Sequence, residues 1–218
     1  MSGTTSSDTA EATLRSDARR NRDQILRAAK EIFAARGTAV PMEEIAREAE
    51  VGVGTLYRRF PDREALILAV FRDSVRAVAA EARAALAEEP TAWAALVRII
   101  GLSAQLRLSM RLQTYSEAVA DMLKADEEIG RHRRAAFDVL EEVVHRAQAE
   151  GSLRTDVGVG DLAMLFVSVM HQTHGLNGEA GGLAPGRVLA IMLDGLRARD
   201  ANPLPGRPLT RADVDAGR

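Results

Sequence analysis

The chain has 218 residues, of which 46% are hydrophobic and 28% charged, a composition that suits one or two folded domains and excludes wholesale disorder. It contains no cysteine, so disulfide bonds and thiolate metal sites are excluded, and a reducing compartment is expected. The net charge of −2 does not single out a binder of nucleic acids, although residues 19–72 carry eleven Arg and Lys against eight Asp and Glu, a local net charge of +3.

The first third of the chain predicts an arm followed by three helices. Residues 1–18 are polar and lack periodicity, so we expect a disordered arm. A helix is predicted from Arg19 to the stop at Gly37, and a second over 42–49, with acidic residues in its first turn. The stretch EVGVG breaks that helix, and a short third helix, TLYRRF, follows before Pro61.

The remainder also predicts helices. A long helix is expected over 62–87, about 39 Å at roughly 1.5 Å per residue. Further helices are predicted over 91–108, 115–124, 126–150, 161–174 and 187–199, with a glycine-rich loop at 175–186 and an unstructured tail at 201–218. No segment alternates like a strand, no apolar run reaches the roughly 18 residues of a membrane span, and the start lacks a signal-peptide core. We expect an all-α, soluble, cytoplasmic protein.

The stretch VGVGTLYRRF, residues 51–60, invites two interpretations. A dinucleotide-binding loop would need a third glycine where Tyr57 stands, and a strand rather than a helix before it. A Walker-type phosphate loop has no matching string in the chain. Two short helices joined by a tight turn are instead typical of a helix-turn-helix, whose second helix enters the DNA major groove.

The segment from Ile25 to Phe71 resembles the DNA-binding domain of the TetR family of transcriptional regulators. Its matching features, in order, are Phe33 and Gly37, then Ile45 and Ala46, then the string GTLYRRF and the string EAL. The resemblance implies a helix-turn-helix domain at 19–72 joined by the long helix to a helical ligand-sensing and dimerisation domain at 73–200. It implies a homodimer that binds a palindromic operator in double-stranded DNA as a repressor and is released by a small apolar or amphipathic effector, without a cofactor.

The resemblance also implies which residues touch DNA. The candidates are Gly54, Thr55, Tyr57, Arg58, Arg59, Arg63, Arg19 and Arg20. Hydroxyl groups and guanidinium groups of this kind bind phosphates and base edges, and arginine with guanine is the commonest specific pair. Leu56 and Phe60 are expected to lie inside, packed on Ile45 and Phe33.

Two residues depart from the family pattern, and two acidic residues near them affect the expected contact with DNA. Glu50 stands where the family usually has a glycine, at a turn that favours positive φ, which should cost about 1 kcal/mol. Pro41 replaces a capping Ser or Thr at the start of the second helix. Glu43 and Glu44 lie near the expected DNA face, where their carboxylates repel phosphate.

The C-terminal half supplies candidates for an effector pocket and a dimer interface. The candidate pocket residues are Trp93, Arg98, Met110, Met122, Phe137, Met170 and His171, because methionine and aromatic side chains suit an apolar ligand. The candidate dimer residues are Leu162, Phe166, Val169, Leu189, Met192 and Leu196, on the apolar helix 161–174 and on the last helix. Core packing explains many of these residues equally well.

Two other classes of protein remain open. One is a helical binding or interaction protein that no longer binds DNA, with Glu50, Pro41, Glu43 and Glu44 as marks of decay. The other is a di-metal enzyme, since Glu142 and His145 form an E-x-x-H pair. Such sites need a second pair and two further glutamates, and the second pair is missing, so we predict no metal site and no catalytic residues.

Overall fold

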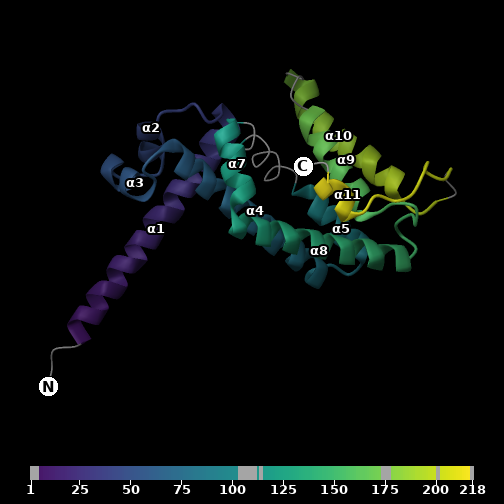
Figure 1. Ribbon diagram of the computed structural model, residues 1–218, viewed down its shortest axis with the longest axis horizontal. Helices are drawn as coiled ribbons and strands as arrows, with labels where there is room; N and C mark the ends of the chain where they lie inside the picture. Colours follow the sequence, from purple (N-terminus) through teal and green to yellow (C-terminus); the bar gives the residue numbers. More distant parts are fainter. Residues whose placement is uncertain (1–4, 103–111, 113–114, 173–177, 200–201, 217–218) are drawn as a thin grey trace. The chain divides into compact units, whose positions relative to one another are not determined.

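Helices account for nearly all regular structure in the part of the chain that the computed structural model describes, namely residues 5–102, 112, 115–172, 178–199 and 202–216 (Figure 1). For 5–15, 166–167, 169–172, 178–182 and 185, the backbone alone is described. The helices are α1 (Thr5–Arg36), α2 (Met42–Glu48), α3 (Val53–Arg59), α4 (Arg63–Glu88), α5 (Ala92–Gly101), α7 (Glu117–Ala125), α8 (Glu127–Ala149), α9 (Val159–Gln172), α10 (Gly178–Leu196) and α11 (Arg211–Ala216). The prediction of an all-α fold is confirmed.

The first helix differs from its prediction at one end. It stops where expected, because Gly37 adopts a φ of +83° and its N–H donates to the carbonyl of Phe33 at 3.1 Å. It begins at Thr5, however, so the predicted disordered arm is wrong for residues 5–18. Ser, Thr and Asp, which are weak helix formers, make up eight of the fourteen residues 5–18. The stretch is helical because it continues an existing helix, so no costly new nucleus is needed.

The described chain divides into two compact units. Unit 1 comprises Met1–Ser74 and Leu108–Asp126, and unit 2 comprises Val75–Arg107 and Glu127–Arg218. The first division falls two residues beyond the predicted boundary, within α4, which has 26 residues. The sequence led us to expect α7 in the second domain, but the segment that contains it belongs to unit 1. At the end of that segment, Asp126 Oδ2 accepts a hydrogen bond from Arg72 Nε of α4 at 2.8 Å.

The core of unit 1 brings α1, α2, α3 and the first half of α4 together. The largest fully buried side chains of these four helices are Ile25, Phe33, Ile45, Leu56, Leu66, Ile67 and Phe71, and the second segment of the unit adds Leu112 and Leu123. The start of α4 is capped, since Asp62 Oδ1 accepts from the N–H of Ala65 at 2.7 Å. At the edge of this core, Lys30 Nζ donates to Asp73 Oδ2 at 2.5 Å and ties α1 to α4.

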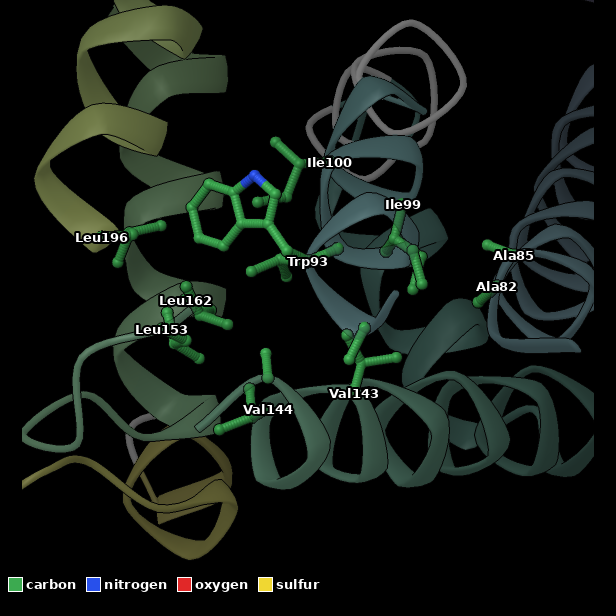
Figure 2. Packing of buried hydrophobic residues seen from close by; sticks show 14 of the residues in the cluster. Ala82, Ala85, Trp93, Ile99, Ile100, Val143, Val144, Leu153, Leu162 and Leu196 are labelled. Atoms are coloured by element: carbon green, nitrogen blue, oxygen red, sulfur yellow. The ribbon is translucent and has the colours of Figure 1, made fainter. Parts of the chain in front are cut away.

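The core of unit 2 gathers side chains from α4, α5, α8, α9 and α10 (Figure 2). Trp93 and Leu96 come from α5, and Val143 and Val144 from α8. Thr91 caps α5, because its hydroxyl accepts from Ala94 N at 3.1 Å. No helix in the described part of the chain has the length and apolar character that crossing a membrane requires.

The C-terminal segment, residues 202–216, packs on unit 2, so the prediction of an unstructured tail is wrong for these residues. Its backbone passes α9 closely: Gly160 N donates to the Leu209 carbonyl at 2.9 Å, and Leu209 N donates to Asp161 Oδ2 at 3.0 Å. A Cβ added to Gly158 would lie 2.3 Å from the Leu209 carbonyl oxygen. The two glycines are therefore required at this contact.

Charged pairs hold the same segment in place. Arg207 forms two hydrogen bonds with Asp213, at 2.7 and 2.6 Å, and Arg211 donates to Asp138 of α8 at 2.8 Å. Asp156, bonded to Arg154 and to the N–H of Leu204, has its pKa lowered to about 2 and stays ionised near neutral pH. Val214 of α11 is buried. Sequence periodicity cannot reveal this arrangement, since its partners are distant in the chain.

The last long helix also starts earlier than predicted. α10 begins at Gly178, inside the stretch expected to be a glycine-rich loop over 175–186. Glycine costs about 1 kcal/mol relative to Ala in a helix, a preference that tertiary context commonly overrides. The predicted loop is therefore wrong over 178–186.

We expect Gly160→Ala to lower the free energy of unfolding by about 1–3 kcal/mol, because the new Cβ would lie 2.5 Å from the Thr210 carbonyl oxygen. The matched control is Gly186→Ala in α10, where a Cβ meets no atom within 4 Å and helix propensity favours alanine. Thermal unfolding followed by circular dichroism should show a lower midpoint for the first variant and an equal or higher one for the second. Equal stabilisation by both would contradict packing of the C-terminal segment on α9.

Candidate DNA-binding interface

The turn between α2 and α3 has the conformation that the sequence predicts. Glu50 adopts a φ of +54°, and no other described residue with a side chain has a positive φ. Its N–H donates to the Arg47 carbonyl at 3.1 Å, and Val51 N donates to the Ala46 carbonyl at 3.0 Å. These bonds end α2 in the way that a glycine usually permits. Glu50 therefore carries backbone strain at the turn of the helix-turn-helix.

At the other end of α2, Pro41 occupies the N-cap position with a φ of −55° and a ψ of 143°. It supplies no side-chain cap, as expected, although its carbonyl accepts from Glu44 N at 3.1 Å. Glu43 and Glu44 in the first turn then compensate in part, because negative side chains are favourable near a helix N-terminus.

The second helix of the motif exposes a basic side. α3 begins at Val53, two residues earlier than predicted, with Gly52 at its N-cap. Leu56 is fully buried and Phe60 is 5% exposed, as the sequence predicts for the side packed on the core. Tyr57 is 40% exposed, and Arg58 and Arg59 are exposed with it.

Hydrogen bonds orient two of these side chains. The Tyr57 hydroxyl donates to Glu43 Oε1 at 3.1 Å, which links α3 to the first turn of α2 and raises the pKa of the phenol. Arg58 folds along its own helix: Nη2 donates to Thr55 Oγ1 at 3.1 Å, and Nε donates to the Gly54 carbonyl at 3.3 Å. The guanidinium is thus held next to the hydroxyl of Thr55, on the exposed side of α3.

Glu44 differs from its neighbour because its charge is compensated. Arg36 forms two hydrogen bonds with its carboxylate, one of them at 3.2 Å, and Arg47 Nη2 lies 3.5 Å from Glu44 Oε1. The hydrogen bond from Arg36 lowers the pKa of Glu44. This glutamate therefore repels phosphate less than its sequence position suggests.

The other candidate DNA contacts lie on α1 and α4. Arg63 is partly buried, and its Nη1 donates to the carbonyls of Thr38 and Val40, the latter at 2.5 Å. It therefore fixes the loop between α1 and α2, a structural role that the sequence did not indicate. Arg19 and Arg20 are exposed on α1. Contacts of these three arginines with phosphate stay predictions.

The candidate effector residues belong to both units. Trp93 lies in the core of unit 2 with the Arg197 guanidinium 3.9 Å from its ring centre, whereas Met122 is exposed in unit 1. Phe137 is half-buried, with Arg211 5.4 Å from its ring centre. Met110 and the side chains of Met170 and His171 lie outside the described residues.

The guanidinium of Arg98, a candidate pocket residue, is engaged by three carboxylates: Nε donates to Glu81 at 2.8 Å, and Nη1 donates to Glu88 at 2.9 Å and to Glu89 at 3.1 Å. Arg98 thus joins α5 to the second half of α4. Its contact with an effector stays a prediction.

The predicted dimer residues contribute mainly to the core of their own unit, and their place at a dimer interface stays a prediction. Leu162 and Leu196 are 2% and 4% exposed because they belong to the core of their own unit, and Leu189 and Met192 pack partly against that core. The side chains of Phe166 and Val169 lie outside the described residues. Five other apolar side chains of these helices are exposed, and we refer to them together as the α9–α10 apolar surface: Met164, Leu165, Leu183, Val188 and Ile191.

Metal ligation receives no support in the described part of the chain, where no group of three or more His, Asp or Glu side chains could hold an ion. Glu142, one half of the E-x-x-H pair, instead accepts from Arg146 Nε at 2.8 Å. This pairing is the ordinary one between residues four apart on an exposed helix.

Comparisons with known proteins identify an N-terminal and a C-terminal region of the chain. Residues 25–70 match the model of bacterial regulatory proteins of the tetR family, and residues 91–198 match the C-terminal domain of SbtR-like transcriptional regulators. A TetR transcription regulatory protein of Mycobacterium vanbaalenii is 34% identical, over 84% of this chain and 99% of that one, with a TM-score of 0.61. The regulator SCO0520 of Streptomyces coelicolor is 31% identical, over 81% and 98%, with a TM-score of 0.66. No curated protein matches the chain.

We expect Glu50→Gly to raise the free energy of unfolding by about 0.5–1 kcal/mol, because glycine adopts a φ of +54° without the steric cost. The control is Glu48→Gly, two residues earlier at the last position of α2, which should lower stability by up to about 1 kcal/mol. Opposite shifts of the thermal midpoint are expected. A midpoint for Glu50→Gly that is unchanged or lowered would count against the turn geometry.

Proposed function

The chain belongs to the TetR family of DNA-binding transcriptional regulators, and on that premise we propose that it is a homodimeric repressor that a small molecule releases from its operator. The observation that carries the proposal is the exposed side of α3. Tyr57, Arg58 and Arg59 point away from the core there, while Leu56 and Phe60 anchor the helix. A short helix held in this way suits insertion into the major groove.

The local charge supports the same interface. Exposed arginines and hydroxyl groups on one side of a helix-turn-helix provide phosphate contacts that fix the protein on DNA, and base contacts then give specificity. Thr55 and Arg58 lie together at the exposed side of α3. We infer that Arg59, also exposed, reaches a base edge or a phosphate on the same face of the duplex.

Dimerisation follows from the symmetry of such operators. Two recognition helices must lie about 34 Å apart to reach successive major grooves, so a two-fold dimer is the natural binding unit. The α9–α10 apolar surface supports this proposal, because exposed apolar patches on a soluble domain usually mark interfaces. Ile191 is 68% exposed and is the most exposed large apolar side chain of that surface.

Release by an effector is the remaining part of the proposal. Unit 2 supplies apolar helices among which an apolar or amphipathic molecule could bind, and α4 continues from that unit into unit 1. A ligand that prefers the form unable to span two grooves would lower operator affinity without touching DNA. To change the ratio of the two forms from 1:99 to 99:1, the ligand must bind one form more tightly than the other by about 5.5 kcal/mol.

The DNA contacts can be tested with duplexes recovered by selection from genomic fragments. We expect Arg58→Ala and Arg59→Ala each to weaken binding by about 1–3 kcal/mol. The slope of the logarithm of the binding constant against the logarithm of the salt concentration should also become shallower, by about 0.9 for each phosphate that the variant no longer neutralises. Fluorescence anisotropy over a salt series measures both. Arg83→Ala, an exposed arginine on the part of α4 in unit 2, is the matched control and should change neither. Wild-type binding that does not depend on salt would contradict the interface.

Ile191→Glu should convert the dimer to a monomer, because it places a charge in a desolvated contact. The control is Met122→Glu on α7, an exposed apolar residue in the other unit. Size-exclusion chromatography with light scattering measures the mass of each variant. If Ile191→Glu remains a dimer, the α9–α10 apolar surface is not the interface.

An effector found by screening should bind the free dimer more tightly than the operator-bound dimer. Linkage requires that its effect on operator affinity equal the operator's effect on effector affinity. Calorimetric titration of the effector into each form measures this ratio. Equal affinities for both forms would show that the compound is not an inducer.

A further inference from the structure

Glu43 stands out at the interface because its charge is not compensated by a cation. It is exposed in the first turn of α2, and no Lys or Arg pairs with it in the described chain. Its neighbour Glu44, by contrast, is held by Arg36 and Arg47. Glu43 therefore brings a full negative charge to a surface proposed to meet DNA.

The position of this carboxylate is defined by the recognition helix. The Tyr57 hydroxyl donates to Glu43 Oε1 at 3.1 Å, and Tyr57 is 40% exposed on α3. The bond thus holds the carboxylate of α2 beside the exposed side chains of α3. Within the described residues, the other oxygen, Oε2, has no hydrogen-bond partner.

A carboxylate at such a place does two things to DNA. It repels any phosphate backbone, which weakens binding that does not depend on sequence. It can also accept a hydrogen bond from a base, and in the major groove the N4 amino group of cytosine is the donor that glutamate pairs with, whereas the O6 and N7 atoms of guanine are acceptors and would repel it. The repulsion lowers affinity for every DNA sequence, whereas the hydrogen bond raises affinity only for sequences with cytosine at the contacted position.

We propose that Glu43, positioned by the Tyr57 hydroxyl, is a specificity-determining residue that accepts from cytosine N4 in each operator half-site and disfavours DNA without that cytosine. The proposal rests on the proposed function, since it needs the dimer to bind DNA through α2 and α3. It gives Tyr57 a positioning role in addition to its predicted phosphate contact.

The test is selection of bound duplexes from a random pool, performed with full-length wild type, Glu43→Gln and Glu48→Gln. Glutamine keeps an acceptor for Tyr57 but loses the charge, and it pairs best with N6 and N7 of adenine. We expect the Glu43→Gln consensus to change from cytosine to adenine at one position in each half-site. Glu48→Gln removes an exposed carboxylate from another side of α2, and its consensus should equal that of the wild type.

Affinity for a shuffled duplex of the same composition gives a second readout. Loss of one negative charge a few ångströms from phosphate should strengthen this binding roughly threefold to fivefold at low salt for Glu43→Gln, and less for Glu48→Gln. Tyr57→Phe keeps the charge but removes the bond that orients it. Its preference for cytosine should weaken, without the gain in affinity for shuffled DNA.

The outcomes separate this proposal from the proposed function. If wild type enriches no sequence, DNA recognition itself fails, and the role of Glu43 fails with it. If wild type enriches a palindrome and Glu43→Gln enriches the same one, the chain is a DNA-binding regulator but Glu43 reads no base, and the proposal is overturned whatever its affinity for shuffled DNA.

Discussion

The burial of Leu56 and Phe60 is the constraint on which the DNA-binding unit depends. α3 has seven residues, too few for a stable isolated helix, so it exists because these two side chains join the core formed by α1, α2 and α4. The same burial fixes the rotation of the helix. With Leu56 inside, Tyr57, Arg58 and Arg59 must face outward. The turn at Glu50 completes the arrangement, and its positive φ shows that the packing is strong enough to hold a strained residue.

Charge at this interface is arranged by pairing. A chain with a net charge of −2 can still meet DNA if the acidic residues near the contact are neutralised, and Arg36 does this for Glu44. Glu43 is left with a tyrosine as its partner, which orients the carboxylate without cancelling its charge. Two adjacent glutamates therefore have different consequences: one maintains the α1–α2 contact, and the other faces the proposed DNA surface.

In unit 2, the apolar side chains of α9 and α10 are divided between the core and the surface. Leu162 and Leu196 belong to the core around Trp93 (Figure 2), while Ile191, on the same helix as Leu196, is exposed. The C-terminal segment adds a second layer of contacts to α8 and α9, made through backbone hydrogen bonds and paired charges. Since the match to SbtR-like C-terminal domains ends at residue 198, this segment lies beyond the part shared with that family model.

Local patterns in the chain were enough to predict most of the helices and the end of α1 at Gly37, because periodicity and turn chemistry depend on neighbours within a few residues. They missed the start of α1, the start of α10 and all of α11. The positive φ at Glu50 and the inward positions of Leu56 and Phe60 were predicted from the resemblance to the TetR family. Partners distant in sequence could not be read in this way: Arg63 with the carbonyls of Thr38 and Val40, Arg98 with its three carboxylates, and Leu209 with Gly160. Which apolar side of α9 and α10 is buried was likewise set by the folded unit, because both sides of these helices are apolar and periodicity alone does not choose between them.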